Sequence, residues 1–157
     1  MTNILFRFVI FGLVAAFPWA TASADEVTVS GSATYIQRWG ETITLENGGR
    51  LERLHLQAII HDDNNSPIDM NAQDCTGTAV YDADGAFVMN TGHCHATDLD
   101  GDTWSMWYHH TPDGNTWGIM GGTGKFAGLS GGGTTFVETI HADGRLFLTY
   151  EGTIATP

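Results

Sequence analysis

Two histidines separated by one residue, His93 and His95, are the first positions whose type and spacing suggest chemistry. In a β-strand they share one face, because side chains alternate between faces. If Thr97 pairs with Thr103 across the following turn, His109 falls on that same face, diagonal to His93. Three neutral imidazoles from adjacent strands can hold zinc or copper and leave a position for water or substrate. The alternative is that these are ordinary histidines of an acidic surface.

A second candidate metal site is the turn that contains Asp98, Asp100 and Asp102, where alternating carboxylates are typical calcium ligands. The glycine follows directly after Asp100, and no glutamate closes a twelve-residue calcium loop. Asp-Gly pairs also recur at other turns of the chain, because both residues favour turn conformations. We therefore expect a plain turn here, with calcium as the alternative.

Aromatic and sulfur-containing side chains alternate along the segment that carries His109, on the face opposite to that histidine. Apolar and aromatic walls with a few polar groups are the usual chemistry of a small-molecule pocket. The residues expected to line such a pocket are Trp104, Met106, Tyr108, Phe136 and Tyr150.

Glu138 is the candidate catalytic residue, because it shares a strand face with Phe136 and Ile140. If that face points into a pocket, the carboxylate can serve as a general acid or base. If Val137 and Thr139 point inward instead, Glu138 is an ordinary surface residue. The pattern leaves both orientations open.

Short alternating segments rich in β-branched and aromatic residues, separated by Asp-Gly turns, follow the first 24 residues. This spacing indicates an all-β sandwich or a closed antiparallel barrel of about eight strands. A barrel leaves no exposed sheet edges. We expect strands at 27–39, 42–45, 50–61, 76–81, 87–97, 103–111, 115–120, 134–141 and 146–153, and an irregular loop at 62–74.

The two cysteines, Cys75 and Cys94, form one disulfide by default in a chain destined for an oxidising compartment. If Asp82 faces Phe87 across the intervening turn, the same register makes the cysteines direct cross-strand neighbours. Such neighbours lie within bridging distance.

The first 24 residues are typical of a signal peptide, with Arg7, an apolar run over 8–17 and small residues before cleavage after Ala24. The apolar run is short for a membrane span, so we expect no membrane insertion after cleavage. The protein is then exported, to the periplasm or the medium, and 25–157 is a single β-barrel domain. Its five basic and eighteen acidic residues give a net charge of −13, which disfavours nucleic acid as a partner.

A glycine-rich stretch at 121–133 has seven glycines in thirteen positions, and we expect a compact loop there. Its order over 121–131, Gly-Gly-Thr-Gly-x-Phe-x-Gly-x-x-Gly, resembles the signature of the allene oxide cyclase and dirigent-protein superfamily. Members of that superfamily are small antiparallel β-barrels, which favours the barrel over the sandwich.

The resemblance implies a cofactor-free barrel that confines a small hydrophobic molecule and steers its cyclisation or isomerisation. Since dirigent proteins form trimers, it also allows a homo-oligomer. Two alternatives stay open: a non-catalytic ligand carrier using the same cavity, and a metal-binding protein using His93, His95 and His109.

Overall fold

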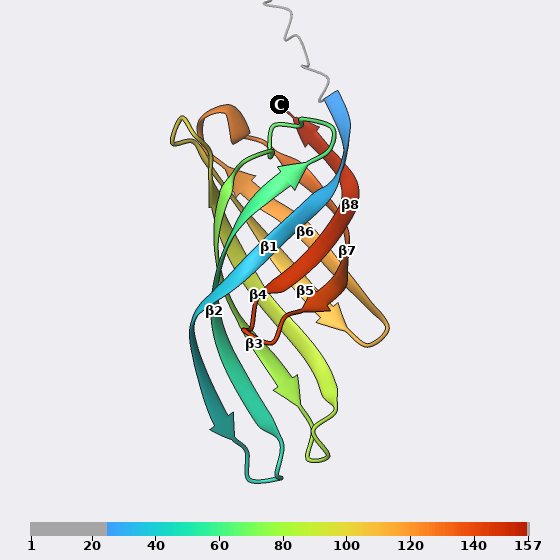
Figure 1. Cartoon of the computed structure of the whole chain (residues 1–157). Helices are drawn as coiled ribbons and strands as arrows, with labels where there is room; N and C mark the ends of the chain where they lie inside the picture. The colour runs from blue at the N-terminus through green and yellow to red at the C-terminus, as the bar shows by residue number, and fades with distance from the viewer. Residues whose placement is uncertain (1–24, 157) are drawn as a thin grey trace, which may run out of the picture.

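The computed structural model describes residues 25–156, which form a closed barrel of eight antiparallel strands in chain order (Figure 1). The all-β barrel is therefore confirmed. Residues 1–24 and Pro157 lie outside the described residues, so the signal peptide and cleavage after Ala24 stay predictions. The elements are β1 (Asp25–Thr44), β2 (Arg50–Asp62), β3 (Ala72–Tyr81), β4 (Phe87–Thr97), β5 (Thr103–Thr111), β6 (Gly114–Gly122), the 3₁₀ helix η1 (Gly124–Phe126), β7 (Ser130–Ile140) and β8 (Leu146–Thr156).

The cysteine register is confirmed, because Cys75 lies directly opposite Cys94 and the two form a disulfide. Nearer the turn the expected register was wrong by one residue. Phe87 pairs with Tyr81 instead of Asp82, because Val88 is an extra, unpaired residue that forms a β-bulge in β4. The expected pairing of Thr97 with Thr103 is also present.

Several strands extend further than expected, and β3 begins at Ala72, inside the irregular loop expected at 62–74. The segments at 27–39 and 42–45 belong to the single strand β1, which continues through a bulge at Arg38. β7 begins at Ser130, so the glycines at 131–133 are strand residues and only 123–129 form a turn. A Cβ at Gly133 would lie 1.9 Å from the Glu151 carbonyl oxygen. Glycine is required there because the neighbouring backbone approaches so closely.

Loops and η1 close the upper end of the barrel as it is drawn in Figure 1. The loop after β2 buries Ile68, and the turn after β6 buries Phe126 and Leu129. Phe126 packs on Trp104, with ring centroids 6.4 Å apart. No helix within residues 25–156 is long and apolar enough to cross a membrane.

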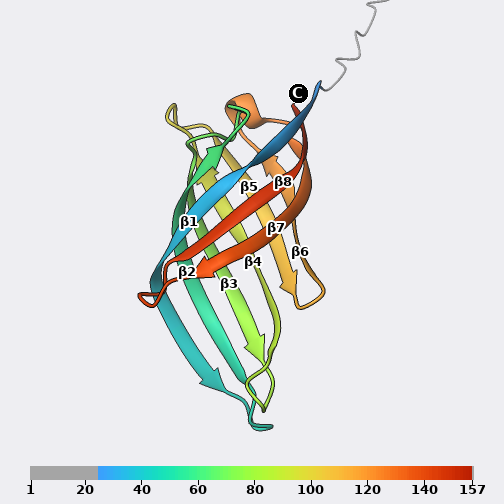
Figure 2. The same cartoon turned by 45° about the vertical axis from the view of Figure 1, so that its right-hand side comes forward.

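Among the described residues, only short hairpin turns connect strands at the lower end. The β1–β2 and β3–β4 hairpins project beyond the β5–β6 and β7–β8 hairpins in both views (Figures 1 and 2). We call this projecting part the lip: β1 after Tyr35, β4 before Asn90, the parts of β2 and β3 paired with them, and the two hairpin turns. Its inner face continues the inner wall of the barrel toward solvent.

Inside the barrel, two glycines facing each other on β3 and β4 make room for a tyrosine of β5. Gly77 pairs with Gly92, and Gly92 pairs with Tyr108. A Cβ at Gly77 would lie 1.9 Å from the Tyr108 hydroxyl oxygen, and a Cβ at Gly92 would lie 2.6 Å from it. The tyrosine ring therefore lies across these glycines, along the inner wall.

We expect Gly77→Ala to lower the free energy of unfolding by about 1–3 kcal/mol, because the added methyl overpacks the wall. Introducing Tyr108→Phe as well should restore part of that loss by removing the overlapping oxygen. Denaturant unfolding of the double-mutant cycle measures the coupling, with Tyr81→Phe as the uncoupled control. An equal cost of Gly77→Ala with and without the Tyr108 hydroxyl would contradict this packing.

Candidate functional site

The interior of the barrel contains a cavity with two lobes. Tyr35, Met106, Thr135 and Leu148 separate them and line both. The upper lobe leaves about 30 Å³ and the lower lobe about 40 Å³ for the centres of water molecules. A buried water needs roughly 10–15 Å³ on this measure. In this conformation each lobe therefore admits a few waters and nothing larger.

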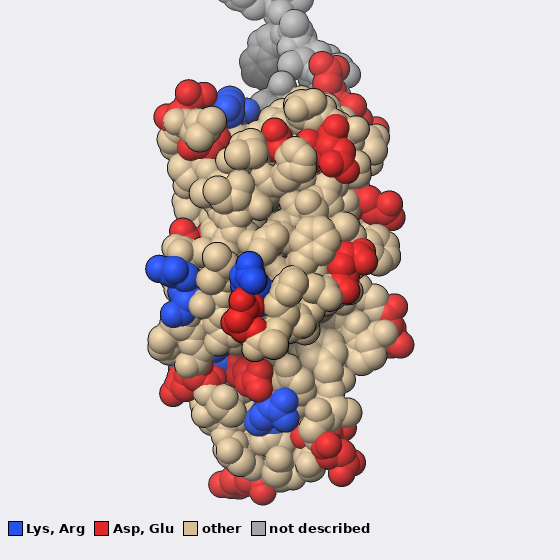
Figure 3. Space-filling view, viewed as in Figure 1, with Lys and Arg blue, Asp and Glu red and all other residues tan. Residues whose placement is uncertain are grey.

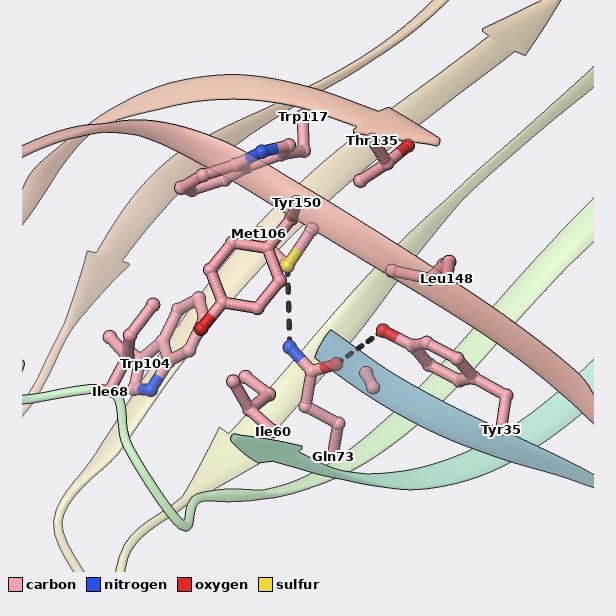
Figure 4. Close-up of a pocket in the computed structure, with 11 residues that line it drawn as sticks. Tyr35, Ile60, Ile68, Gln73, Trp104, Met106, Trp117, Thr135, Leu148 and Tyr150 are labelled. Carbon is pink, nitrogen blue, oxygen red and sulfur yellow. Dashed lines mark hydrogen bonds between the residues drawn. The ribbon is translucent and has the colours of Figure 1, made fainter. Parts of the chain in front are cut away.

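The polar groups of the upper lobe bond to one another (Figure 4). The Tyr35 hydroxyl donates to Gln73 Oε1 at 2.6 Å, and Gln73 Nε2 donates to Met106 Sδ at 3.3 Å. Trp104 Nε1 donates to Asn71 Oδ1 at 2.7 Å. These pairs fix the side chains and leave the upper lobe lined mainly by apolar surface.

Asp62 is a buried carboxylate at the upper end, and three donors occupy it. The backbone N–H groups of Asn64 and Ser66 bond to Oδ1, and the Tyr150 hydroxyl donates to Oδ2 at 3.0 Å. A carboxylate held in this way anchors the loop that closes the barrel. It is therefore a structural group in this conformation.

The lower lobe contains two buried polar atoms without a protein partner, Tyr108 Oη and Asn90 Oδ1. The Cys75–Cys94 disulfide, Met106 and apolar residues such as Leu56 surround them. Most buried polar groups in proteins are hydrogen-bonded, so two polar atoms that face one cavity without a protein partner indicate a place for water or a ligand.

The side chains of the lower lobe are uncharged at neutral pH. Burial raises the pKa of Tyr108 to about 12. Burial, and to a lesser extent the neighbouring His109, lowers the pKa of His110 to about 4. His110 Nε2 shares a hydrogen bond with Thr135 Oγ1 at 3.1 Å. The lobe thus offers neutral donors and acceptors.

Charged groups reappear at the lower mouth, on the inner face of the lip. Arg50 Nε bonds to Glu52 Oε1 at 2.9 Å, and the Arg50 guanidinium lies 3.7 Å from the centroid of the Tyr81 ring. Tyr81 in turn contacts Phe87 edge to face. This group borders the passage between solvent and the lower lobe.

Four of the five residues expected to form a ligand-binding wall lie in the barrel interior, and their role in binding stays a prediction. Trp104, Met106 and Tyr150 line the upper lobe, while Met106 and Tyr108 line the lower lobe. Phe136 does not join them: it lies half exposed on the outer face, opposite Thr149 of β8. The bulge in β7 comes after it and does not change its orientation.

Glu138 lies outside the cavity, so the structure does not support its expected catalytic role. It falls in the β7 bulge between Val137 and Thr139 and accepts a hydrogen bond from Thr149 Oγ1 at 2.8 Å on the exposed face. The inward carboxylates are Asp62 and Glu52, which sequence reasoning missed. The sequence of β2 could have identified them. Its apolar residues lie at the even-numbered positions Leu54, Leu56, Ala58 and Ile60, and Glu52 and Asp62 are also even-numbered, so all six share one face of the strand.

The three expected metal ligands do not form a metal site in this conformation. His93 and His95 are exposed on the outer face, and His95 Nδ1 pairs with Ser105 Oγ at 3.2 Å. His109 lies on the next strand opposite Thr91. Within residues 25–156, no group of three or more His, Cys, Asp or Glu side chains has an arrangement that fits a metal ion.

In the aspartate turn, a lysine takes the place that was considered for calcium. The Lys125 ammonium contacts the Asp98 carboxylate and lies 3.5 Å from Asp100 Oδ2, while the Lys125 backbone N–H donates to Asp102 Oδ2. Hydrogen bonding to Lys125 lowers the pKa of Asp98. The carboxylates thus tie this turn to the glycine-rich turn after β6.

Acidic groups are numerous on the outer surface. In Figure 3 they gather at both ends and along the right-hand edge, whereas the upper middle of this face is largely free of charge. On this face the acidic groups therefore lie outside an interior whose lower lobe is neutral.

Comparison with known proteins shows the fold alone. No protein-family model and no curated protein sequence matches the chain. Solved structures do: the pterocarpan synthase dirigent protein GePTS1 superposes with a TM-score of 0.53 and 13% identity, over 86% of this chain and 88% of that one. The pterocarpan synthase dirigent protein PsPTS1 superposes with a TM-score of 0.54 and 11% identity, over 84% and 96%. The chain thus has the eight-stranded barrel fold of dirigent proteins.

The tyrosines provide a test of the interior. Burial raises the pKa of Tyr35, Tyr81, Tyr108 and Tyr150, which are all four tyrosines of the chain. We expect tyrosinate absorbance to develop at a higher pH in the folded protein than in denaturant, where phenols titrate near pH 10. The unfolded chain loses phenolic protons first, so the free energy of unfolding should fall as pH rises past about 10. Tyrosinate absorbance that develops over the same pH range in the folded protein as in denaturant, with the barrel intact by circular dichroism, would be inconsistent with this interior.

Proposed function

We propose that this protein is exported and binds a small hydrophobic molecule inside its barrel, where confinement steers a cyclisation or isomerisation. The observation that carries the proposal is the lower lobe. It is an apolar cavity with two unpaired polar atoms, below an end closed by loops and next to an end bridged only by turns. The fold shared with dirigent proteins supports it.

Binding requires a local opening, because the lower lobe has room for water only. The side chains in the way belong to the mouth: Arg50 stacks on Tyr81, and Leu146 lines the lower lobe from β8. Rotating side chains at the lower end leaves the strand pairing and the loops of the upper end unchanged. The lower mouth is therefore the favoured route of entry.

The chemistry proposed is one that confinement can accelerate. Holding a flexible molecule in the reactive conformation removes much of the entropic part of a barrier. The Tyr108 hydroxyl can stabilise a developing negative charge as a neutral donor. Neither inward carboxylate is free in this conformation, since Asp62 accepts three hydrogen bonds and Glu52 pairs with Arg50. A cyclisation or isomerisation that needs no charged acid or base suits this interior.

The engagement of both carboxylates also favours a second candidate, a carrier that holds the same ligand without turnover. The two functions share the binding site and differ in the fate of the ligand. Recovery of the bound molecule unchanged after prolonged incubation identifies a carrier.

Binding can be followed by the two tryptophans of the interior. Trp39 and Trp107 are exposed, so Trp39→Phe together with Trp107→Phe leaves Trp104 and Trp117 as the reporters of the mature chain. We expect ethylbenzene to shift the indole emission of this variant saturably. Adding Ala79→Leu should abolish the response, because the larger side chain would take up space at the lower lobe. Ala79 is buried and lies directly opposite Asn90, which lines that lobe.

The matched control is Ala127→Leu, a change of equal size at an exposed position. It should leave the response intact, and circular dichroism should show folded barrels for both variants. A response that survives Ala79→Leu, or no saturable response at all, would count against a ligand site in the barrel.

Export is tested by the mass of the protein recovered outside the cytoplasm of its host. We expect a chain that begins at Asp25 and carries the Cys75–Cys94 disulfide, with no thiol detectable until a reductant is added. Full-length chain found only in the cytoplasm would contradict the proposed localisation.

A further inference from the structure

We propose that the lower lobe selects a neutral carbonyl compound whose oxygen accepts a hydrogen bond from Tyr108. This inference rests on the proposed function, because it specifies the ligand of the same cavity. It is carried by the one hydroxyl in the described lumen that is both deeply buried and unpaired.

The position of the Tyr108 hydroxyl is fixed by the backbone. The side chain is 7% exposed, and its ring crosses Gly92 to place the oxygen over Gly77. The surrounding backbone atoms leave little freedom for the ring to shift. A ligand therefore meets a preorganised donor, with little ordering cost at the moment of binding.

The other tyrosines of the interior differ in this respect. Tyr35 donates to Gln73 and Tyr150 donates to Asp62, so both hydroxyl protons are already used. Tyr108 has no such partner among the described residues. A hydroxyl proton without an acceptor favours a ligand with an exposed lone pair, as in a ketone or an aldehyde.

The rest of the lobe excludes charge. Tyr108 and His110 are both neutral near pH 7, and the residues that line this lobe include no lysine, arginine or carboxylate. A carboxylate ligand would lose its hydration without gaining a counter-ion, and an amine would meet the same cost. Anionic and cationic ligands are therefore disfavoured relative to neutral ones.

The apolar part of the ligand would face sulfur and hydrocarbon. The Cys75–Cys94 disulfide and Met106 contribute polarisable sulfur, and Leu56 and Leu148 contribute aliphatic surface. Thioether sulfur makes favourable contacts with aromatic rings. A ring or an unsaturated chain next to the carbonyl group matches this wall.

Three probes of nearly the same shape test the selectivity: acetophenone, ethylbenzene and benzoate. Titration calorimetry with the exported protein should show acetophenone binding about tenfold or more tightly than ethylbenzene. The reason is that a hydrocarbon displaces water from the Tyr108 hydroxyl and leaves it unsatisfied. Benzoate should bind more weakly than either.

Tyr108→Phe should abolish the preference for acetophenone over ethylbenzene while ethylbenzene binding persists. Tyr81→Phe is the matched control, since it removes a hydroxyl at the mouth, and it should preserve the preference. Thermal unfolding followed by circular dichroism verifies that both variants are folded.

The outcomes separate the two proposals. Equal affinity for acetophenone and ethylbenzene, benzoate binding as tightly as acetophenone, or a preference that survives Tyr108→Phe would each overturn this inference while lumen binding stands. Failure of all three probes to bind would overturn the inference and count against the proposed function as well.

Discussion

The pairing of β1 with β8 is the interaction on which the rest of the structure depends. It runs from Asp25–Thr156 to Tyr35–Leu146 and closes the sheet into a barrel. Once the sheet is closed, inward side chains share a small fixed volume. A large inward side chain therefore needs small residues opposite it. The ring of Tyr108 is accommodated only because Gly77 and Gly92 have no side chains.

Polar chemistry in this interior is graded along the barrel axis. At the top, Asp62 is saturated by donors and anchors a loop; at the bottom, Glu52 is paired with Arg50 near solvent. Between them lie neutral groups, and in the lower lobe two of their atoms are unpaired. A barrel of this kind depends on shape and on a few fixed dipoles, so its residues leave little trace as a motif.

Sequence reasoning performed best where a local rule was sufficient. Strand alternation and hairpin spacing predicted an all-β sandwich or barrel, and the resemblance of the glycine-rich stretch favoured the barrel. One assumed register placed Cys75 opposite Cys94. Sequence reasoning failed where the alternation of faces had to be carried across a bulge: Glu138 lies in the β7 bulge itself, and the bulge at Val88 in β4 moved Phe87 by one partner. Which face points inward is set by closure of the whole sheet, so Phe136 could not be placed from its own strand.

The lip has a consequence for association between chains. Beyond Tyr35, β1 pairs only with β2, and below Asn90, β4 pairs only with β3, so the lip presents two free backbone edges. Such edges are templates for strand addition and fibrous growth. The bulge at Arg38 breaks the regular hydrogen-bond ladder of the longer edge, and Glu41 adds charge beside it. The strands that border the entrance to the lower lobe thus carry features that disfavour edge-to-edge pairing.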